Sequence, residues 1–103
     1  MKLTLHQLEV FKAVVTTGSI TKASRMLKLS QPSISQNLNK IEETLGVQLL
    51  VPNKKGTSIL TPAGEFWHKA AQDVLGKITD LMNSHDEKYL PSNLKFLWAL
   101  LLH

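Results

Sequence analysis

Apolar residues recur at intervals of three and four along most of this chain, which is the spacing that places them on one face of an α-helix. The first such stretch is preceded by Thr4 and Gln7, which have the spacing of a capping box. A wide apolar face follows, made of Leu5, Leu8, Phe11, Val14 and Val15. The pattern therefore predicts an opening helix over residues 5–17.

A second, shorter helix is predicted to begin at residue 20. Gly18 can end the first helix because glycine adopts positive φ freely, and the hydroxyl of Ser19 can cap the next one. The inner face of this second helix is formed by Ile20, Ala23 and Leu27. Since Ala23 is small, it suits the close approach of a neighbouring helix.

The third predicted helix, capped by Ser30 and ending at Leu45, combines an apolar stripe with a distinctive polar face. Pro32 lies in its first turn, where a missing N–H costs little. The stripe consists of Ile34, Leu38, Ile41 and Leu45. The polar face carries short or flat donors and acceptors, namely Ser33, Ser35, Gln36, Asn39 and Lys40. A helix built only for stability would more often carry Glu, Lys and Ala there.

Taken alone, this third stretch has the simplest interpretation of a solvated amphipathic helix. The short helix directly before it changes that interpretation, because two short helices joined by a tight turn form a helix-turn-helix, here over about residues 20–39. In that motif the second helix enters the DNA major groove by its N-terminal residues. We therefore expect Gln31, Ser33, Ser35 and Gln36 to face base edges.

A two-stranded hairpin is predicted next, over about residues 47–60. Gly46 ends the third helix, and residues 47–51 form a short apolar run with β-branched members that indicates a strand. Residues 52–57 indicate a turn, with Lys54 and Lys55 at its tip, and residues 58–60 the return strand. These lysines are either DNA-phosphate or minor-groove contacts or part of an ordinary solvated turn. A hairpin in this place is the wing of a winged helix-turn-helix.

A long amphipathic helix is predicted from Pro62 to about Glu87, with Thr61 as its cap. Its apolar pattern runs past 20 residues, which is more helix than the small head can cover. The surplus surface calls for a partner helix. We expect the dimerisation residues to be Phe66, Trp67, Ala70, Ala71, Val74, Ile78 and Leu81.

These elements predict a mainly α fold. A winged helix-turn-helix of three helices and a two-stranded wing occupies residues 1–61, a linker and dimerisation helix residues 62–87, and a short apolar tail residues 88–103. The tail is too short in apolar residues to span a membrane. It either packs back on the linker helices or is a disordered remnant of truncation.

Charge is unevenly distributed along the 103 residues. Residues 1–60 hold eight Lys/Arg against three Asp/Glu, net +5, whereas residues 61–103 hold four against five, net −1. A basic first half suits binding to a polyanion, and a near-neutral second half suits contact with protein. Eleven of the twelve cations are lysines, which favours phosphate attraction over bidentate reading of guanine.

Enzymatic chemistry finds no support in the sequence, and no cofactor or metal is expected. There is no cysteine, so a disulfide framework and a thiolate metal site are both excluded. The four histidines are scattered, and His85 with Asp86 and Glu87 indicates a solvated helix end rather than a metal triplet. No stretch at the N-terminus has the pattern of a signal peptide, so a cytoplasmic protein is expected.

Many of these positions together resemble the DNA-binding domain of LysR-type transcriptional regulators. The resemblance covers about residues 4–85 and rests on Ala23, Leu27, Ser30-Gln31-Pro32-Ser33-Ile34-Ser35, Leu38, Ile41-Glu42, Leu45-Gly46, Leu49-Leu50 and Leu60-Thr61-Pro62-Ala63-Gly64. It implies a winged helix-turn-helix joined to a linker helix that pairs antiparallel with a second copy. The positions that match the family's DNA contacts are Gln31, Pro32, Ser33, Ser35 and Gln36, with Thr61 near the DNA backbone.

The sequence also departs from the family's pattern. Members often carry Arg directly after the first wing strand, whereas here residues 51–53 intervene before Lys54 and Lys55. The family's large effector-binding domain has no counterpart in these residues, so no small-molecule effector is expected on this chain. The chain is either a fragment or a stand-alone head.

The expected function is sequence-specific binding of double-stranded DNA at an inverted repeat, by a homodimer or higher oligomer that regulates transcription. The DNA-binding residues that we expect are Ser30, Gln31, Pro32, Ser33, Ser35, Gln36, Asn39, Lys40, Lys54, Lys55 and Thr61. The alternative is a protein-interaction module that forms mixed dimers with full-length regulators through its long helix. That module would need no basic head, so the net charge of +5 favours DNA binding.

Overall fold

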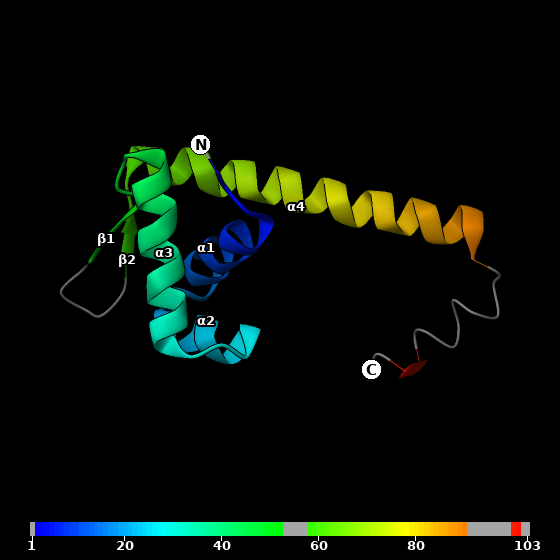
Figure 1. Ribbon diagram of the computed structural model, residues 1–103, viewed down its shortest axis with the longest axis horizontal. Helices are drawn as coiled ribbons and strands as arrows, with labels where there is room; N and C mark the ends of the chain where they lie inside the picture. The colour runs from blue at the N-terminus through cyan, green and yellow to red at the C-terminus, as the bar shows by residue number, and fades with distance from the viewer. Residues whose placement is uncertain (1, 53–57, 91–99, 102–103) are drawn as a thin grey trace.

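The structure, a computed structural model, describes residues 2–52, 58–90 and 100–101 (Figure 1). The helices are α1 (Leu5–Thr17), α2 (Ile20–Leu27), α3 (Gln31–Leu45) and α4 (Pro62–Tyr89), and the strands are β1 (Leu50–Pro52) and β2 (Ser58–Leu60). The first three helices and the hairpin gather at one end, and α4 runs out beyond them (Figure 1). The predicted mainly α architecture is confirmed.

Each helix begins directly after a residue whose side chain accepts a hydrogen bond from a free amide of the first turn. Thr4 and Gln7 form the predicted capping box on α1, with both hydrogen bonds at 3.1 Å. Ser19 accepts from the amide of Lys22 at 3.0 Å, and Ser30 accepts from that of Ser33 at 3.2 Å. Local sequence chemistry therefore determines where these helices start.

The turn between α2 and α3 is held by one serine. The carbonyl of Ser24 accepts hydrogen bonds from the amides of Lys28 and Leu29, and its hydroxyl donates to the carbonyl of Leu29 at 2.6 Å. Lys28 takes a left-handed conformation, with φ of 56°. The sequence did not indicate this conformation, because Lys is not a residue that favours positive φ. The three bonds to Ser24 hold it there and so fix how α3 leaves α2.

The core lies where α1, α2 and α3 meet the first half of α4. Phe11, Ile34, Ile41, Ala23 and Leu49 are each exposed by no more than 1%. The predicted stripes of α2 and α3 are confirmed. On α1 the buried face is shifted, because Val10 and Ala13 are buried while Leu5 is 48% exposed.

The wing is a short antiparallel pair in which Leu50 opposes Leu60, Val51 opposes Ile59 and Pro52 opposes Ser58. The first strand therefore begins at residue 50, not at residue 47 as predicted. The amide of Leu49 donates to the Glu42 carboxylate at 2.6 Å, and its carbonyl accepts from the amide of Thr61 at 3.0 Å. Leu49 is thus bonded to α3 and to the start of α4, and its side chain enters the core.

The first half of α4 packs on the head through its smallest residues. Gly64 and Ala71 are buried, and a Cβ on Gly64 would collide with the backbone carbonyl of Leu49. The helix ends at Tyr89, two residues later than predicted. None of the helices within the described ranges combines the length and the apolar character that crossing a membrane requires.

Candidate nucleic-acid interface

The polar face of α3 points away from the core for most of its length. Gln31, Pro32, Gln36, Asn39 and Lys40 are exposed, whereas Ser33 and Ser35 are half-buried. The face carries amides, hydroxyls and one ammonium group, which together can donate to and accept from base edges and phosphates. The polar face that the sequence predicted is therefore open to solvent, although Ser33 and Ser35 are less exposed than Gln31 and Gln36.

The start of α3 uses part of its polar chemistry internally. The hydroxyl of Ser30 accepts from the Ser33 amide, and the Ser33 carbonyl accepts from the Nδ2 amide of Asn37 at 2.9 Å. Asn37 therefore stiffens the first turns of the helix instead of facing outward. Because these side chains are occupied, the amides of Gln31 and Gln36 are the long polar groups left to reach outward from this part of α3.

A groove of about 310 Å³ separates α3 from the wing. Ser35 and Asn39 line it from α3, and Gln48, Leu50 and Pro52 line it from the opposite side. The sequence did not place Gln48 in the site, because its position across the groove from Asn39 depends on how the wing folds back. The polar face of α3 and the wing are thus neighbouring surfaces at one end of the molecule (Figure 1).

Glu42 joins α3 to the base of the wing. Its carboxylate accepts from the amide of Leu49 at 2.6 Å and from that of Leu50 at 3.2 Å. An acid on a helix that faces DNA would repel phosphate, but this one is turned toward backbone amides. Glu42 therefore fixes where the wing starts relative to α3, a role that sequence reasoning missed.

Thr61 has its hydroxyl engaged within the protein. The hydroxyl donates to the carbonyl of Gln48 at 2.6 Å and accepts from the amide of Gly64 at 3.0 Å. It therefore caps α4 and ties that cap to the base of the wing. A contact from Thr61 to the DNA backbone, as the family resemblance implies, would use the remaining lone pair of this oxygen.

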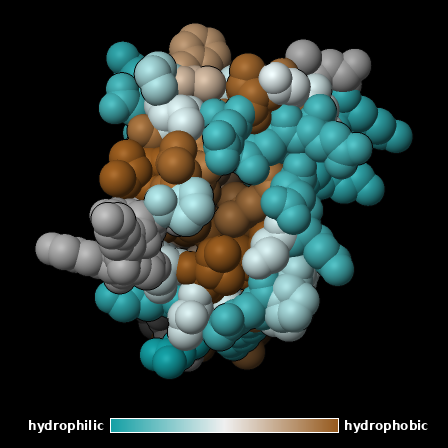
Figure 2. Space-filling view, turned by 90° about the vertical axis from the view of Figure 1, so that its left-hand side faces the viewer, coloured by the Kyte–Doolittle hydropathy of each residue, from teal (hydrophilic) through white to brown (hydrophobic). Residues whose placement is uncertain are grey.

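Figure 2 views the end of the molecule that carries α3 and the wing, and shows hydrophobic surface bordered by hydrophilic side chains. The cross-strand pair Val51 and Ile59 is 40% and 55% exposed. Lys54 and Lys55, the two cations expected at the wing tip, lie outside the described residues.

The expected dimerisation stripe on α4 separates into two groups. Ala71 faces the core of its own protomer with no exposed surface, so its assignment to a dimer contact is wrong. Phe66, Val74 and Leu81 are 65%, 41% and 56% exposed, and Trp67, Ala70 and Ile78 are half-buried. The helix therefore presents one apolar side to the head and another to the solvent.

The three histidines that the structure describes, His6, His68 and His85, do not belong to a cluster of potential metal ligands. Across the part of the chain that the structure describes, no group of three potential metal ligands occurs. His85 lies 3.4 Å from Asp86 at an exposed position on α4. His68 packs edge-on against Phe11, and its buried Nε2 atom has no hydrogen-bond partner among the described residues.

Comparison with known proteins gives one consistent result. The model of the family described as "Bacterial regulatory helix-turn-helix protein, lysR family" matches residues 5–65. The HTH-type transcriptional activator AaeR of Escherichia coli (strain K12) is 38% identical over 90 residues, which are 86% of this chain and 28% of AaeR. The HTH-type transcriptional activator CmpR of Synechocystis sp. is 39% identical over 79 residues, 76% of this chain and 25% of CmpR.

Solved structures agree with these relatives. A BenM_DBD/catB site 1 DNA complex has a TM-score of 0.81 at 30% identity, covering 86% of this chain and 99% of that one. A Corynebacterium glutamicum OxyR C206 mutant has a TM-score of 0.77 at 34% identity, covering 89% of this chain and 29% of that one. This chain spans about a quarter of the length of the curated relatives it matches. The mixed-dimer alternative has no support in these comparisons.

Proposed function

Because this chain belongs to the lysR family of bacterial regulatory helix-turn-helix proteins, we propose that it regulates transcription by binding double-stranded DNA as a dimer. One observation carries the proposal: an exposed polar face on α3 stands beside a wing at one end of the molecule. The target is an inverted repeat, since the symmetry of an operator mirrors the two-fold symmetry of the protein. The protein then acts on its DNA site in the cytoplasm.

Base reading is assigned to Gln31, Ser33, Ser35 and Gln36. The exposed glutamine amides support this assignment, because an amide can pair bidentately with the N6 and N7 atoms of adenine. Asn39 and Lys40 lie one turn further along and are exposed. Their exposed amide and ammonium groups support an assignment as contacts to the phosphates that border the DNA major groove.

Dimerisation is assigned to the exposed apolar side of α4, consisting of Phe66, Trp67, Ala70, Val74, Ile78 and Leu81. Exposed apolar surface of this extent along one helix supports pairing with a second helix. The antiparallel sense follows from membership of the family. With two heads held by one pair of helices, two copies of α3 meet the two halves of an inverted repeat.

Base reading can be tested with Gln36→Ala, compared with the control Gln72→Ala, which removes the same amide from an exposed position on α4. Binding should be measured by gel shift on the specific site and on random DNA of equal length. Losing a good bidentate pair should lower discrimination by about 1–3 kcal/mol. An equal loss on both DNAs would contradict the assignment.

The wing can be tested separately through salt dependence. Lys54→Ala with Lys55→Ala should lower the magnitude of the log–log salt slope by about 0.9 for each DNA phosphate that is no longer neutralised, and binding should weaken similarly on every sequence. The matched control is Lys69→Ala with Lys77→Ala on α4, where both lysines are exposed. If the slope stays unchanged, Lys54 and Lys55 belong to an ordinary solvated turn.

A further inference from the structure

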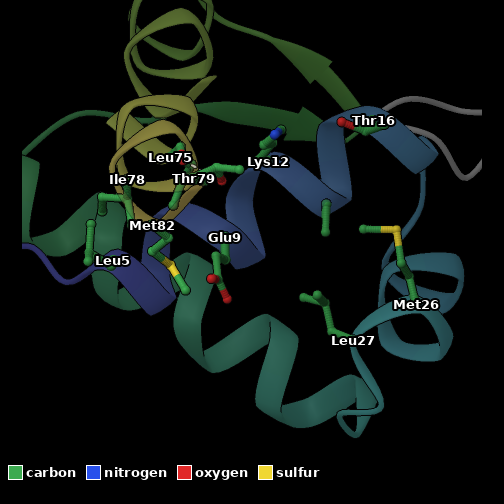
Figure 3. A pocket seen from close by; sticks show the side chains of 11 residues that line it. Leu5, Glu9, Lys12, Thr16, Met26, Leu27, Leu75, Ile78, Thr79 and Met82 are labelled. Atoms are coloured by element: carbon green, nitrogen blue, oxygen red, sulfur yellow. Dashed lines mark hydrogen bonds between the residues drawn. The ribbon is translucent and has the colours of Figure 1, made fainter. Parts of the chain in front are cut away.

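A groove of about 520 Å³ lies between α4 and the side of the head formed by α1 and α2 (Figure 3). Leu75, Ile78 and Met82 line it from α4, and Leu5 and Met26 line it from the head. Met82, Met26 and Leu5 are 63%, 55% and 48% exposed. These side chains point into a space that the described residues leave uncovered.

The groove continues along α4 toward the end of the helix. A second hollow of about 510 Å³ is lined by Ile78, Leu81, Met82, His85 and Asp86. Both hollows include Ile78 and Met82. Because they share these two residues, the hollows adjoin each other along α4 from Leu75 to His85, and we call them together the channel. Its lining is mostly apolar, with Glu9, Lys12 and Asp86 as the charged members.

This channel overlaps the proposed dimer seam at Ile78 and Leu81, but the rest of its apolar lining, namely Leu5, Met26, Leu75 and Met82, lies outside the seam. At about 100° per residue, Leu75 and Met82 lie roughly a third of a turn around the helix from Ala70, Val74 and Leu81. A helix of a second chain that covers the seam therefore leaves much of the channel open. A further occupant of the channel would take Leu5, Met26 and Met82 out of water, which is favourable.

The chain itself carries a segment with the right chemistry. Residues 94–102 contain eight apolar side chains and one charge, that of Lys95. Among them Leu100 and Leu101 are described, and they are 61% and 79% exposed. Such a segment and the channel are two apolar surfaces in one molecule, and burying one against the other is favourable for both.

Residues 94–102 are long enough to reach the channel of their own chain. From Leu90, Met82 lies about 12 Å and Leu75 about 22 Å back along the helix axis, at 1.5 Å per residue. Nine residues cover about 13 Å as a helix, or about 30 Å when extended. Residues 94–102 can therefore run antiparallel to α4 over the near part of the channel in either form, and over all of it when extended.

We propose that residues 94–102 fold back and dock in the channel formed by α4, α1 and α2 of their own chain. Docking covers Met82 and Ile78 on α4 and brings Leu100 and Leu101 out of water. It also braces the distal half of α4 against the head. The contact requires neither DNA nor a second chain, so it stands apart from the proposed function.

Trp98 provides a reporter for this contact, because the chain has only one other tryptophan, Trp67. In the full chain carrying Trp67→Phe, the fluorescence of Trp98 should be blue-shifted and protected from acrylamide. Adding Met82→Lys places a charge in the channel and should move the emission to longer wavelength and increase quenching. The control Asn83→Lys adds the same charge at an exposed neighbour that lines neither hollow, and should leave the signal unchanged.

A mixing experiment distinguishes docking in the same chain from docking in a second copy. The Trp67→Phe chain is refolded with an excess of a chain carrying Trp67→Phe, Trp98→Phe and Met82→Lys. The emission of Trp98 should stay blue-shifted if the tail occupies its own channel. A shift to longer wavelength would place the tail on a partner chain, and a Trp98 exposed from the outset would exclude docking; either result overturns the proposal.

Discussion

The two halves of α4 have similar helical patterns but different surroundings. In residues 62–75, Gly64 and Ala71 are buried and Leu75 packs on the core. In residues 76–89, none of the side chains is buried, and most are exposed. The first half is thus part of the head, whereas the second half presents apolar surface that the head does not cover. The comparison shows that amphipathic periodicity reveals an apolar face but not what covers it.

The largest expected effect separates assembly from folding. Val74→Asp with Ile78→Asp places two charges in the proposed seam, and we expect the dimer to be lost in sedimentation, because an unpaired buried charge is strongly unfavourable. Circular dichroism should still report a folded head. The control Gln72→Asp with Asn83→Asp adds the same charges at exposed positions, and it should leave the dimer intact. Monomers from both variants would point to a general charge effect.

A matched pair of phenylalanines tests the same contrast within the protomer. Phe11 has no exposed surface and Phe66 is 65% exposed. Phe11→Ala should lower the free energy of unfolding by about 3–5 kcal/mol, through lost transfer energy and the cavity left behind. Phe66→Ala should change the stability of the monomer by less than about 0.5 kcal/mol. Urea unfolding at low protein concentration measures both free energies of unfolding. Equal losses in the two variants would contradict the expected difference between the buried and the exposed phenylalanine.

Two glycines on α4, one in each half, allow the two halves to be compared by the same type of substitution, glycine to alanine. Gly64→Ala should destabilise the head by about 1–3 kcal/mol, because its Cβ would meet the carbonyl of Leu49 and, at 2.9 Å, the side chain of Leu60. Gly76→Ala should stabilise by about 1 kcal/mol, since no neighbouring group in the described part of the chain lies within 4 Å of its Cβ and Ala has the higher helix propensity. Thermal unfolding should show shifts of opposite sign.

The smallest effect concerns the link between α3 and the wing. Glu42→Gln keeps an acceptor but removes the charge that strengthens the bonds to the amides of Leu49 and Leu50, which should cost about 1 kcal/mol. Glu43→Gln is the control, because Glu43 is exposed on the same helix. Equal stability of the two variants in urea would show that the charge of Glu42 contributes nothing at this position.

The helices, their caps and the polar face of α3 could be predicted from sequence because their determinants are local. Ser19, Ser30 and Thr61 cap the helices that they precede, and the stripe of α3 is buried as its spacing indicates. The positive φ of Lys28 and the acceptor role of Glu42 depend on contacts formed only in the folded chain. For the same reason the sequence could not show that Ala71 is buried against the head of its own protomer and not against a second chain.

Gly76 lowers the intrinsic helix stability of the distal half of α4. Beyond it, α4 has 13 residues left, residues 77–89, a length at which an unsupported helix is marginal in water. Glycine weakens propagation by about 1 kcal/mol relative to alanine where the support of the head ends. The helical structure of this segment therefore depends on contacts made by its apolar side chains. Whichever surface covers it, a partner helix or the chain's own tail, also supplies the free energy that stabilises the helix.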